Sequence, residues 1–247
     1  MNQFLVSKYF YAMSLRGIFP IDKWDFNSES VFANFPAEDY EEMTRYARDE
    51  KYKKGQIIFR EGGIPSGIYY LVEGKVKKYK VDKFEKEQII YVANTGELIG
   101  YHAVLSTERY PDSAAALEDC RVLFIPKEDF LRVLAQSPLL SGRLLKMLSH
   151  EFTVLTNNIT IFAQRPARER LAITLIVLRE KFKKGNPEGQ PITINMSRDD
   201  IANMAGTTRE NAVRLLREFK DSGIIETQGR KIWVTDVKKM IATSNYE

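Results

Sequence analysis

The sequence predicts an α+β protein: an N-terminal antiparallel β-barrel of the jelly-roll type, a long helix, and a C-terminal winged helix-turn-helix. Three observations predict this class. Short β-branched and aromatic runs recur about every ten residues, apolar residues later recur at spacings of three and four, and two capping signals flank a glycine near the end. We expect an N-terminal extension over 1–27, the barrel over 28–137, the long helix over 138–164 and the winged helix-turn-helix over 165–247.

The composition is that of a packed globular protein. The 247 residues are 44% hydrophobic and 28% charged, which argues against wholesale disorder. No apolar run approaches the roughly 18 residues of a membrane helix, and we expect a cytoplasmic protein with no membrane contact. One cysteine, Cys120, and two histidines, His102 and His150, leave little for a metal site or a hydrolase triad, so we expect neither a metal nor an enzyme.

Aromatic residues crowd the N-terminal extension without a clear period. They are Phe4, Tyr9, Phe10, Tyr11, Phe19, Trp24 and Phe26. Two interpretations stay open: an extension that packs on a neighbouring surface, or an arm that binds a partner or covers a ligand.

The barrel follows a short helix expected over Val31–Tyr46. Turn signals such as Gly62-Gly63 and Glu73-Gly74 separate the expected strands. These strands are Gln56–Phe59, Ile68–Val72, Val76–Val81, Gln88–Ala93 and Val122–Ile125.

The long helix carries two apolar rows. A heptad seam is predicted to pair two copies of the chain through Leu145, Leu148, Phe152, Leu155, Ile159 and Phe162. A second row widens this apolar face and contains Leu144, Met147, Val154 and Ile161. A helix that packs only on its own barrel is the alternative; a helix shared between two subunits explains both rows.

Near the C-terminus, capping residues predict two short helices joined by Gly206. Ser197 with Asp200 opens the first helix, and Thr207 with Glu210 forms a capping box that opens the second. The second helix is predicted to place Val213, Leu216 and Phe219 inward and to end at Gly223. A hairpin of Ile224–Thr227 and Ile232–Thr235 follows, with the basic tip Gln228-Gly229-Arg230-Lys231.

This arrangement is typical of a DNA reader. Arg209, Glu210 and Arg214 fall in the first two turns of the second helix, where arginine can read guanine and glutamate can read cytosine. Residues 165–247 hold 16 lysines and arginines against 11 acidic residues, whereas the rest of the chain has a net charge of −1. The candidate contacts to the DNA backbone are Ser197, Thr207, Thr208, Arg230 and Lys231.

Several motifs resemble the CRP/FNR family of bacterial transcription regulators. The stretch 197–216 (SRDDIANMAGTTRENAVRLL) resembles that family's helix-turn-helix, and Ala167–Ala172 resembles its hinge. KGQIIF at 54–59, IYYLVEG at 68–74 and GELIG at 96–100 resemble its cyclic-nucleotide-binding barrel. The resemblance implies a homodimeric sensor that binds double-stranded DNA at a pseudo-palindrome, with RNA polymerase as a further partner if the protein is an activator.

The effector positions depart from the nucleotide-binding pattern. Tyr101 stands where the resemblance implies a ribose-binding glutamate, and Tyr110 stands where it implies a phosphate-binding arginine. Without those groups a cyclic nucleotide is poorly held, so we expect no response to cyclic AMP. The candidates to line the pocket of an unknown small-molecule effector are Gly100, Tyr101, His102, Tyr110, Ser113, Leu155 and Thr156.

Other readings are weaker. The cysteines of the iron–sulfur branch are missing from the N-terminal region, so we expect no cofactor, with haem on His102 or His150 as the exception. The alternative function is a haem- or other small-molecule-binding sensor whose DNA binding is secondary. The loop Phe182–Pro191 lies where some relatives touch RNA polymerase, although it equally suits an idle solvated loop.

Overall fold

The computed structural model describes residues 15, 17–23, 31–184, 186 and 190–246. The described residues form two compact units. We name them after the roles expected from the sequence: the sensor unit lies within residues 26–152, and the reader unit combines the described N-terminal residues with those from 153 onward. No helix in the described ranges is long and apolar enough to cross a membrane.

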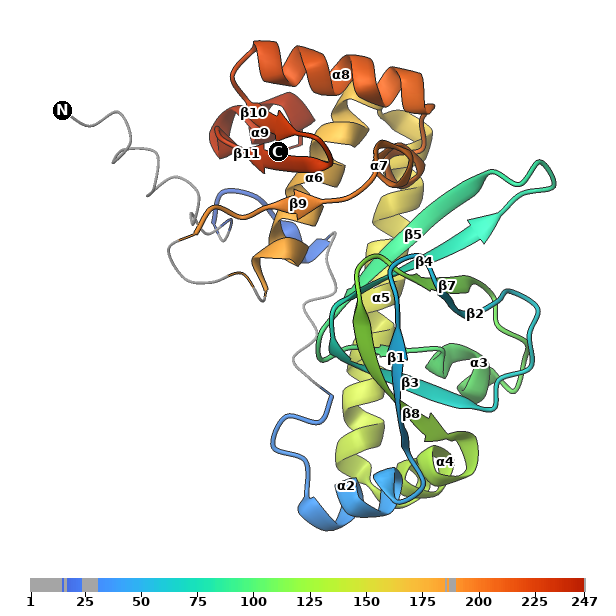
Figure 1. Ribbon diagram of the computed structural model, residues 1–247. Coiled ribbons are helices and arrows are strands. Elements are labelled where there is room, and N and C mark those ends of the chain that lie inside the picture. The colour runs from blue at the N-terminus through green and yellow to red at the C-terminus, as the bar shows by residue number, and fades with distance from the viewer. Residues whose placement is uncertain (1–14, 16, 24–30, 185, 187–189, 247) are drawn as a thin grey trace. The chain divides into compact units, whose positions relative to one another are not determined.

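The sensor unit is built from antiparallel strands, as predicted (Figure 1). Its described residues form one four-stranded sheet in the order β1-β8-β3-β6 and another in the order β2-β7-β4-β5. The strands are β1 (Arg48–Tyr52), β2 (Ile57–Phe59), β3 (Gly67–Glu73), β4 (Lys75–Val81), β5 (Glu87–Asn94), β6 (Leu98–Ile99), β7 (Ser113–Ala116) and β8 (Cys120–Pro126).

The expected strands form because β-branched and aromatic residues pack between the two sheets. Three short strands escape the sequence pattern. β1 reads Arg-Asp-Glu-Lys-Tyr because it is an edge strand that pairs only with β8. β7 reads Ser-Ala-Ala-Ala, a run of small residues that is fully buried between β2 and β4. β6 is only two residues long, too short to show a period.

Helices cover one side of this unit. The first, α2, is shorter than expected, because residues 31–34 form a turn and Pro36 precedes the first helical residue. Phe130 of α4 and Leu140 of α5 are completely buried in the core that these helices share with β3 and β8. The bounds are α2 (Ala37–Thr44), α3 (Tyr101–Ser106), α4 (Lys127–Gln136) and α5 (Pro138–Gln164).

The two apolar rows of α5 differ in exposure. Leu144, Val154 and Ile161 of the second row are buried. The seam residues are instead exposed, from 41% at Phe162 to 69% at Phe152, with Leu148 alone half-buried. The seam is therefore an apolar stripe that the described part of one chain leaves open to solvent.

The reader unit packs its helices around α6, whose residues from Leu171 to Val177 are all buried. Its described residues also form a three-stranded antiparallel sheet in the order β10-β11-β9. The elements are α6 (Ala167–Lys183), β9 (Ile194–Asn195), α7 (Arg198–Ala205), α8 (Arg209–Asp221), β10 (Ile225–Gln228), β11 (Lys231–Val234) and α9 (Val237–Ser244).

Two local predictions about α8 are wrong. The N-cap is Thr208, whose hydroxyl accepts from the Asn211 amide, because Gly206 and Thr207 are both used to complete the turn. Val213 points outward and is 45% exposed, since the buried face follows Ala212, Leu215, Leu216 and Phe219 at helical spacing. Val213 lies one residue, or about 100°, off that face.

The described residues of the N-terminal extension pack on the reader unit. Leu15 is 1% exposed and Phe19 is 3% exposed, and the Phe19 ring lies 5.8 Å from that of Tyr246. The Asn157 side-chain amide of α5 donates to the Lys23 carbonyl at 3.1 Å. Phe4, Tyr9, Phe10, Tyr11, Trp24 and Phe26 lie outside the described residues.

Gly67 marks the closest approach inside the sensor sheets. A Cβ there would lie 2.2 Å from the Ile125 carbonyl oxygen and 2.6 Å from the Phe124 ring. We predict that Gly67→Ala lowers the free energy of unfolding by about 1–3 kcal/mol, because paired backbone cannot move aside. Denaturant unfolding measures this change.

Gly142→Ala is the matched control, since a Cβ at this helical position meets nothing within 4 Å. It should raise the stability of α5 by about 0.5–1 kcal/mol. Equal stability of the two variants would contradict the analysis of Gly67.

Candidate nucleic-acid interface and effector region

A single arginine of α6 fixes the turn between α7 and α8. The Arg170 guanidinium donates to the carbonyls of Ala205 at 2.9 Å, Gly206 at 2.8 Å and Arg165 at 2.7 Å. The first two carbonyls end α7, where the helix itself offers no donor. Gly206 takes the left-handed conformation, with φ of 62°, which lets the chain turn into α8.

Ser197 begins α7 as predicted. Its hydroxyl accepts from the Asp200 amide at 3.0 Å and donates to the Asp200 carboxylate at 2.6 Å. The one O–H donor of this hydroxyl is therefore engaged in the cap, and any hydrogen bond from Ser197 to a phosphate falls to its backbone amide.

The first two turns of α8 present a charged, exposed face. Arg209, Glu210 and Arg214 are all exposed, and Val213 lies among them. The backbone amides at the start of this helix and the Thr208 hydroxyl complete a surface of hydrogen-bond donors that suits a polyanion.

The two arginines of this face have partners within the motif. Arg209 Nε lies 3.5 Å from an Asp199 carboxylate oxygen of α7, and both side chains are more than 60% exposed. Arg214 donates to the Asn211 side-chain oxygen at 2.7 Å. Sequence reasoning missed the role of Asn211, because a side-chain amide in a helix has no distinctive pattern.

The β10–β11 hairpin forms a wing beside these helices. Its two-residue turn is Gly229-Arg230, and Gly229 has a positive φ of 57°. Arg198 of α7 donates to the carbonyls of Gly229 at 2.9 Å and Arg230 at 3.4 Å, which ties the wing to the helix-turn-helix. The side chains of Arg230 and Lys231 remain exposed.

In the sensor unit, two of the effector candidates converge on a carboxylate from α5. The Tyr101 hydroxyl donates to Glu151 at 2.5 Å, and His102 Nε2 lies 2.6 Å from the other Glu151 oxygen. Tyr101 is 1% exposed, and the Glu151 side chain is 13% exposed. Sequence reasoning missed Glu151 because only the apolar residues of the seam helix define its period.

The charges around Glu151 keep it ionised. Burial raises the pKa of Glu151, but the hydrogen bond and charge of His102, the Tyr101 hydroxyl and the Lys78 charge lower it more, so the pKa lies below its ordinary value. Burial and the Glu151 charge raise the pKa of Tyr101, which keeps the phenol protonated as the donor.

Three further candidates lie deeper among the strands. Gly100 and Tyr110 are neighbours, since a Cβ on Gly100 would lie 3.2 Å from the Tyr110 ring. That ring stacks on Phe59 with centroids 4.1 Å apart, and burial raises the pKa of its hydroxyl. Ser113 is buried and accepts from the Glu61 backbone amide at 2.9 Å.

The remaining two candidates, Leu155 and Thr156, belong to the reader unit by their contacts. Both are exposed, and the Thr156 hydroxyl donates to the Thr153 carbonyl at 2.8 Å. The structure therefore groups Gly100 with Tyr110 and Tyr101 with His102, and adds neither α5 residue to these groups.

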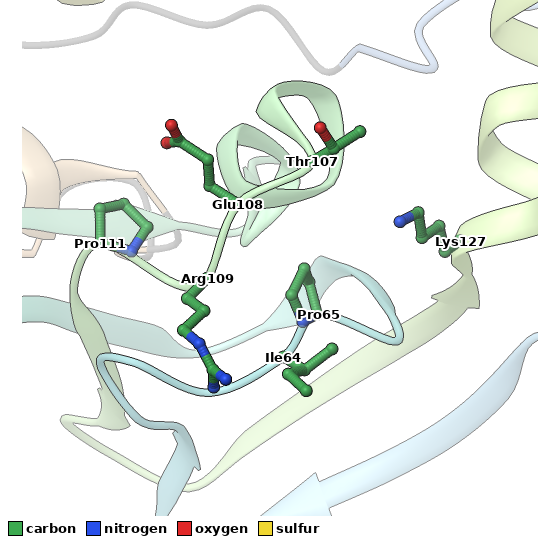
Figure 2. Close-up of a pocket in the computed structure, with 7 residues that line it drawn as sticks. All are labelled: Ile64, Pro65, Thr107, Glu108, Arg109, Pro111 and Lys127. Carbon is green, nitrogen blue, oxygen red and sulfur yellow. The ribbon is translucent and has the colours of Figure 1, made fainter.

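An open cleft of about 530 Å³ lies on the surface of the sensor unit (Figure 2). It contains none of the candidate effector residues, although Arg109 lines it and donates to the Gly62 carbonyl at 2.8 Å. The lining residues are Ile64, Pro65, Thr107, Glu108, Arg109, Pro111 and Lys127.

The described residues contain no cluster of three or more histidine, cysteine or acidic side chains arranged to hold a metal ion. Cys120 is buried, and this burial raises the pKa of its thiol.

Both halves of the chain match known families of domains. Residues 49–137 match the cyclic nucleotide-binding domain, and residues 169–243 match the Crp-like helix-turn-helix domain. A fold that joins a β-sheet sensor to a helix-turn-helix with a wing defines a DNA-binding transcription regulator.

Curated relatives agree with this class. The chain is 29% identical over 194 residues to the anaerobic regulatory protein of Haemophilus influenzae, covering 78% of this chain and 75% of that protein. It is also 29% identical over 195 residues to the transcriptional activator protein anr of Pseudomonas aeruginosa, covering 79% and 80%. The structure of FixK2 from Bradyrhizobium japonicum shares the fold, with a TM-score of 0.70, 22% identity and coverage of 80% of this chain and 96% of that one. The chain belongs to the CRP/FNR family of transcription regulators.

The Glu151 cluster leads to a pH-dependent prediction. Because the folded-state pKa of Glu151 is depressed, its contribution to stability is present above the unfolded pKa of about 4.3 and is lost as the pH falls through the folded value. Glu151→Gln should therefore lower the free energy of unfolding at pH 7 by about 1–3 kcal/mol, and this difference should shrink below about pH 4.

Urea unfolding of wild type and variant at several pH values measures this difference. Tyr101→Phe is the companion variant, since it removes one donor to Glu151 and leaves His102 in place. A difference between wild type and Glu151→Gln that is the same at pH 7 and pH 3 would argue against the charged cluster.

Proposed function

We propose that this chain acts as a homodimer that binds a pseudo-palindromic DNA site and does not respond to cyclic AMP. One observation carries the proposal: the apolar seam of α5 is exposed in the single chain, and the charged face of α8 in the reader unit is exposed as well. Pairing two copies along the seam removes the apolar stripe from water. It also supplies the two readers that a two-fold DNA site requires.

The exposed stripe needs a partner for a physical reason. Scattered single apolar residues on a surface are ordinary, but a continuous row at heptad spacing is typical of a helix–helix interface. Phe152 and Ile159 are the most prominent, at 69% and 67% exposed. A second copy of α5 is the matching surface, because the same seam meets itself across a two-fold axis.

In the proposed complex each α8 enters a major groove. Arg209 and Arg214 read guanine through its O6 and N7 acceptors, and Glu210 accepts from the cytosine amino group. The contacts to phosphates come from Thr207, Thr208, Arg230, Lys231 and the backbone at Ser197. Half-sites then lie about one helical turn, ~34 Å, apart.

The sensor residues do not fit a cyclic nucleotide. Tyr101 fills the position of the ribose acceptor, and its hydroxyl is already committed to Glu151. Tyr110 fills the position of the phosphate cation and stacks on Phe59. The nearby Lys78 ammonium is paired with Asp112 at 3.1 Å, and only 12% of the Lys78 side chain and 7% of the Asp112 side chain are exposed. A buried phosphate would meet two aromatic rings and a carboxylate in place of a free cation.

The alternative of a haem sensor has less support. Nε2 of His102 would have to leave Glu151 before it could bind iron.

A charge in the seam should prevent dimerisation. Because Phe152 is exposed in the single chain, Phe152→Glu should leave the fold intact while burying two carboxylates at the paired seam. Sedimentation equilibrium should show a dimer for wild type and a monomer for the variant. Leu139→Glu is the control, since Leu139 is 42% exposed on α5 but lies off the seam. A wild-type monomer at micromolar concentration would refute the homodimer.

Removing either reading arginine should cost specificity. Arg209→Ala and Arg214→Ala should each weaken binding to the selected site by about 1–3 kcal/mol and leave binding to random duplex nearly unchanged. Lys231→Ala should instead weaken binding to all sequences and reduce the slope of log K against log salt by about one. Fluorescence anisotropy with duplexes selected from a random pool tests both. Equal loss on selected and random DNA for the arginine variants would overturn their assignment.

Cyclic AMP should bind weakly or not at all. Isothermal titration calorimetry of the purified chain with cyclic AMP should give no heat of binding in the micromolar range, because the ribose and phosphate partners are replaced. Saturable micromolar binding would show that the sensor accepts the nucleotide after all.

A further inference from the structure

We infer that Asn211 is a positioning residue that sets the direction of the Arg214 guanidinium before DNA is bound. The inference rests on the proposed function, since it concerns how one of the proposed base-reading arginines is held. Asn211 is not itself assigned a contact with DNA.

The side-chain amide of Asn211 joins two groups of the motif. Its Nδ2 donates to the Thr207 hydroxyl oxygen at 2.8 Å, and its Oδ1 accepts from Arg214 Nη2 at 2.7 Å. The backbone amide of the same residue donates to the Thr208 hydroxyl at 3.2 Å. Asn211 is half-buried. These three hydrogen bonds hold both ends of its side-chain amide and its backbone.

The chemistry allows one orientation of this amide. A guanidinium has only donors, so the carbonyl oxygen of Asn211 must face Arg214 and the amino group must face Thr207. Thr207 follows the turn glycine, whose carbonyl is held by Arg170 of α6. Arg214 is therefore linked by hydrogen bonds to Asn211 and Thr207, and the turn beside Thr207 is held by Arg170 of α6. This chain of contacts fixes the direction of the Arg214 side chain relative to the core of the reader unit.

The consequence is a difference between the two arginines. Arg214 is tied by a hydrogen bond to a half-buried amide, whereas the partner of Arg209 is an exposed carboxylate at 3.5 Å. A long exposed side chain loses rotamer freedom when it binds, and an arginine that is already oriented loses less. Arg214 should discriminate its base pair more strongly because of Asn211, while Arg209 gains nothing from it.

The test is a double-mutant cycle on the full-length chain, with Asn211→Leu and Arg214→Ala alone and together. Leucine keeps the branched shape of asparagine and removes both hydrogen bonds of the amide. Dissociation constants are measured by anisotropy on the duplex selected by wild type and on a set with each half-site base pair replaced in turn. Circular dichroism and thermal melting establish that each variant is folded.

We expect Asn211→Leu to weaken binding to the selected duplex about three- to tenfold. The lost discrimination should fall on the base pair at which Arg214→Ala also loses preference, and the preference that depends on Arg209 should persist. Adding Asn211→Leu to Arg214→Ala should change the affinity less than twofold, because the positioned group is gone.

Two variants serve as controls. Asn211→Asp keeps an acceptor toward Arg214 and should retain the preference at its base pair, although the added charge weakens binding to all duplexes alike. Asp199→Asn alters the partner of Arg209 and should leave the Arg214 base pair unaffected.

Three results would overturn the inference. Additive losses in the double variant would mean that Asn211 acts on DNA independently of Arg214. A uniform loss over all base pairs and random DNA would mean a structural role only, and wild-type affinity for Asn211→Leu would mean no role. These differ from failure of the proposed function, in which no sequence is selected or neither arginine variant loses base preference; that result would overturn both.

Discussion

The charged face of α8 depends on one interaction, in which the Arg170 guanidinium donates hydrogen bonds to three backbone carbonyls. They belong to Arg165, Ala205 and Gly206. Carbonyls at a helix end are left without donors by the helix itself, and here a guanidinium from α6 satisfies them. Because the same group contacts the segment before α6 and the turn after α7, it sets the angle at which α8 leaves the unit. That angle therefore sets the direction in which Arg209 and Arg214 project from α8.

The long helix α5 obeys a second constraint, since one period of apolar residues serves two surfaces. Residues of the second row such as Val154 are buried within the chain, whereas seam residues such as Phe152 and Ile159 are exposed to solvent. Glu151 adds a polar function to the same helix, with its carboxylate held by Tyr101 and His102 one residue before the exposed Phe152. Tyr101 and His102 of α3 therefore contact a residue directly next to the seam in the chain. Coupling between α3 and the seam would need no chain of intermediate residues.

Sequence reasoning predicted the parts that repeat and missed the parts that depend on distant partners. The strands and the two apolar rows of α5 leave periodic signals, and the Ser197 cap of α7 leaves a local one. The charged strand β1 escaped because edge pairing with β8 tolerates a polar sequence. Leu216 and Phe219 of α8 are buried as predicted, but Val213 was placed inward because it is apolar, and the neighbouring Ala212 takes the buried position instead. Glu151, Arg170 and Asn211 carry hydrogen bonds whose partners no local pattern announces.

The packing of Phe19 on Tyr246 has a consequence for synthesis on the ribosome. One unit is assembled from both ends of the polypeptide, while the other comes from a continuous stretch between them. Residues 26–152 are all synthesised well before Tyr246, whereas Phe19 cannot meet its partner ring until Tyr246 has been made. Contacts so far apart in sequence form late and slowly, so we expect the sensor unit to fold before the reader unit gains this contact.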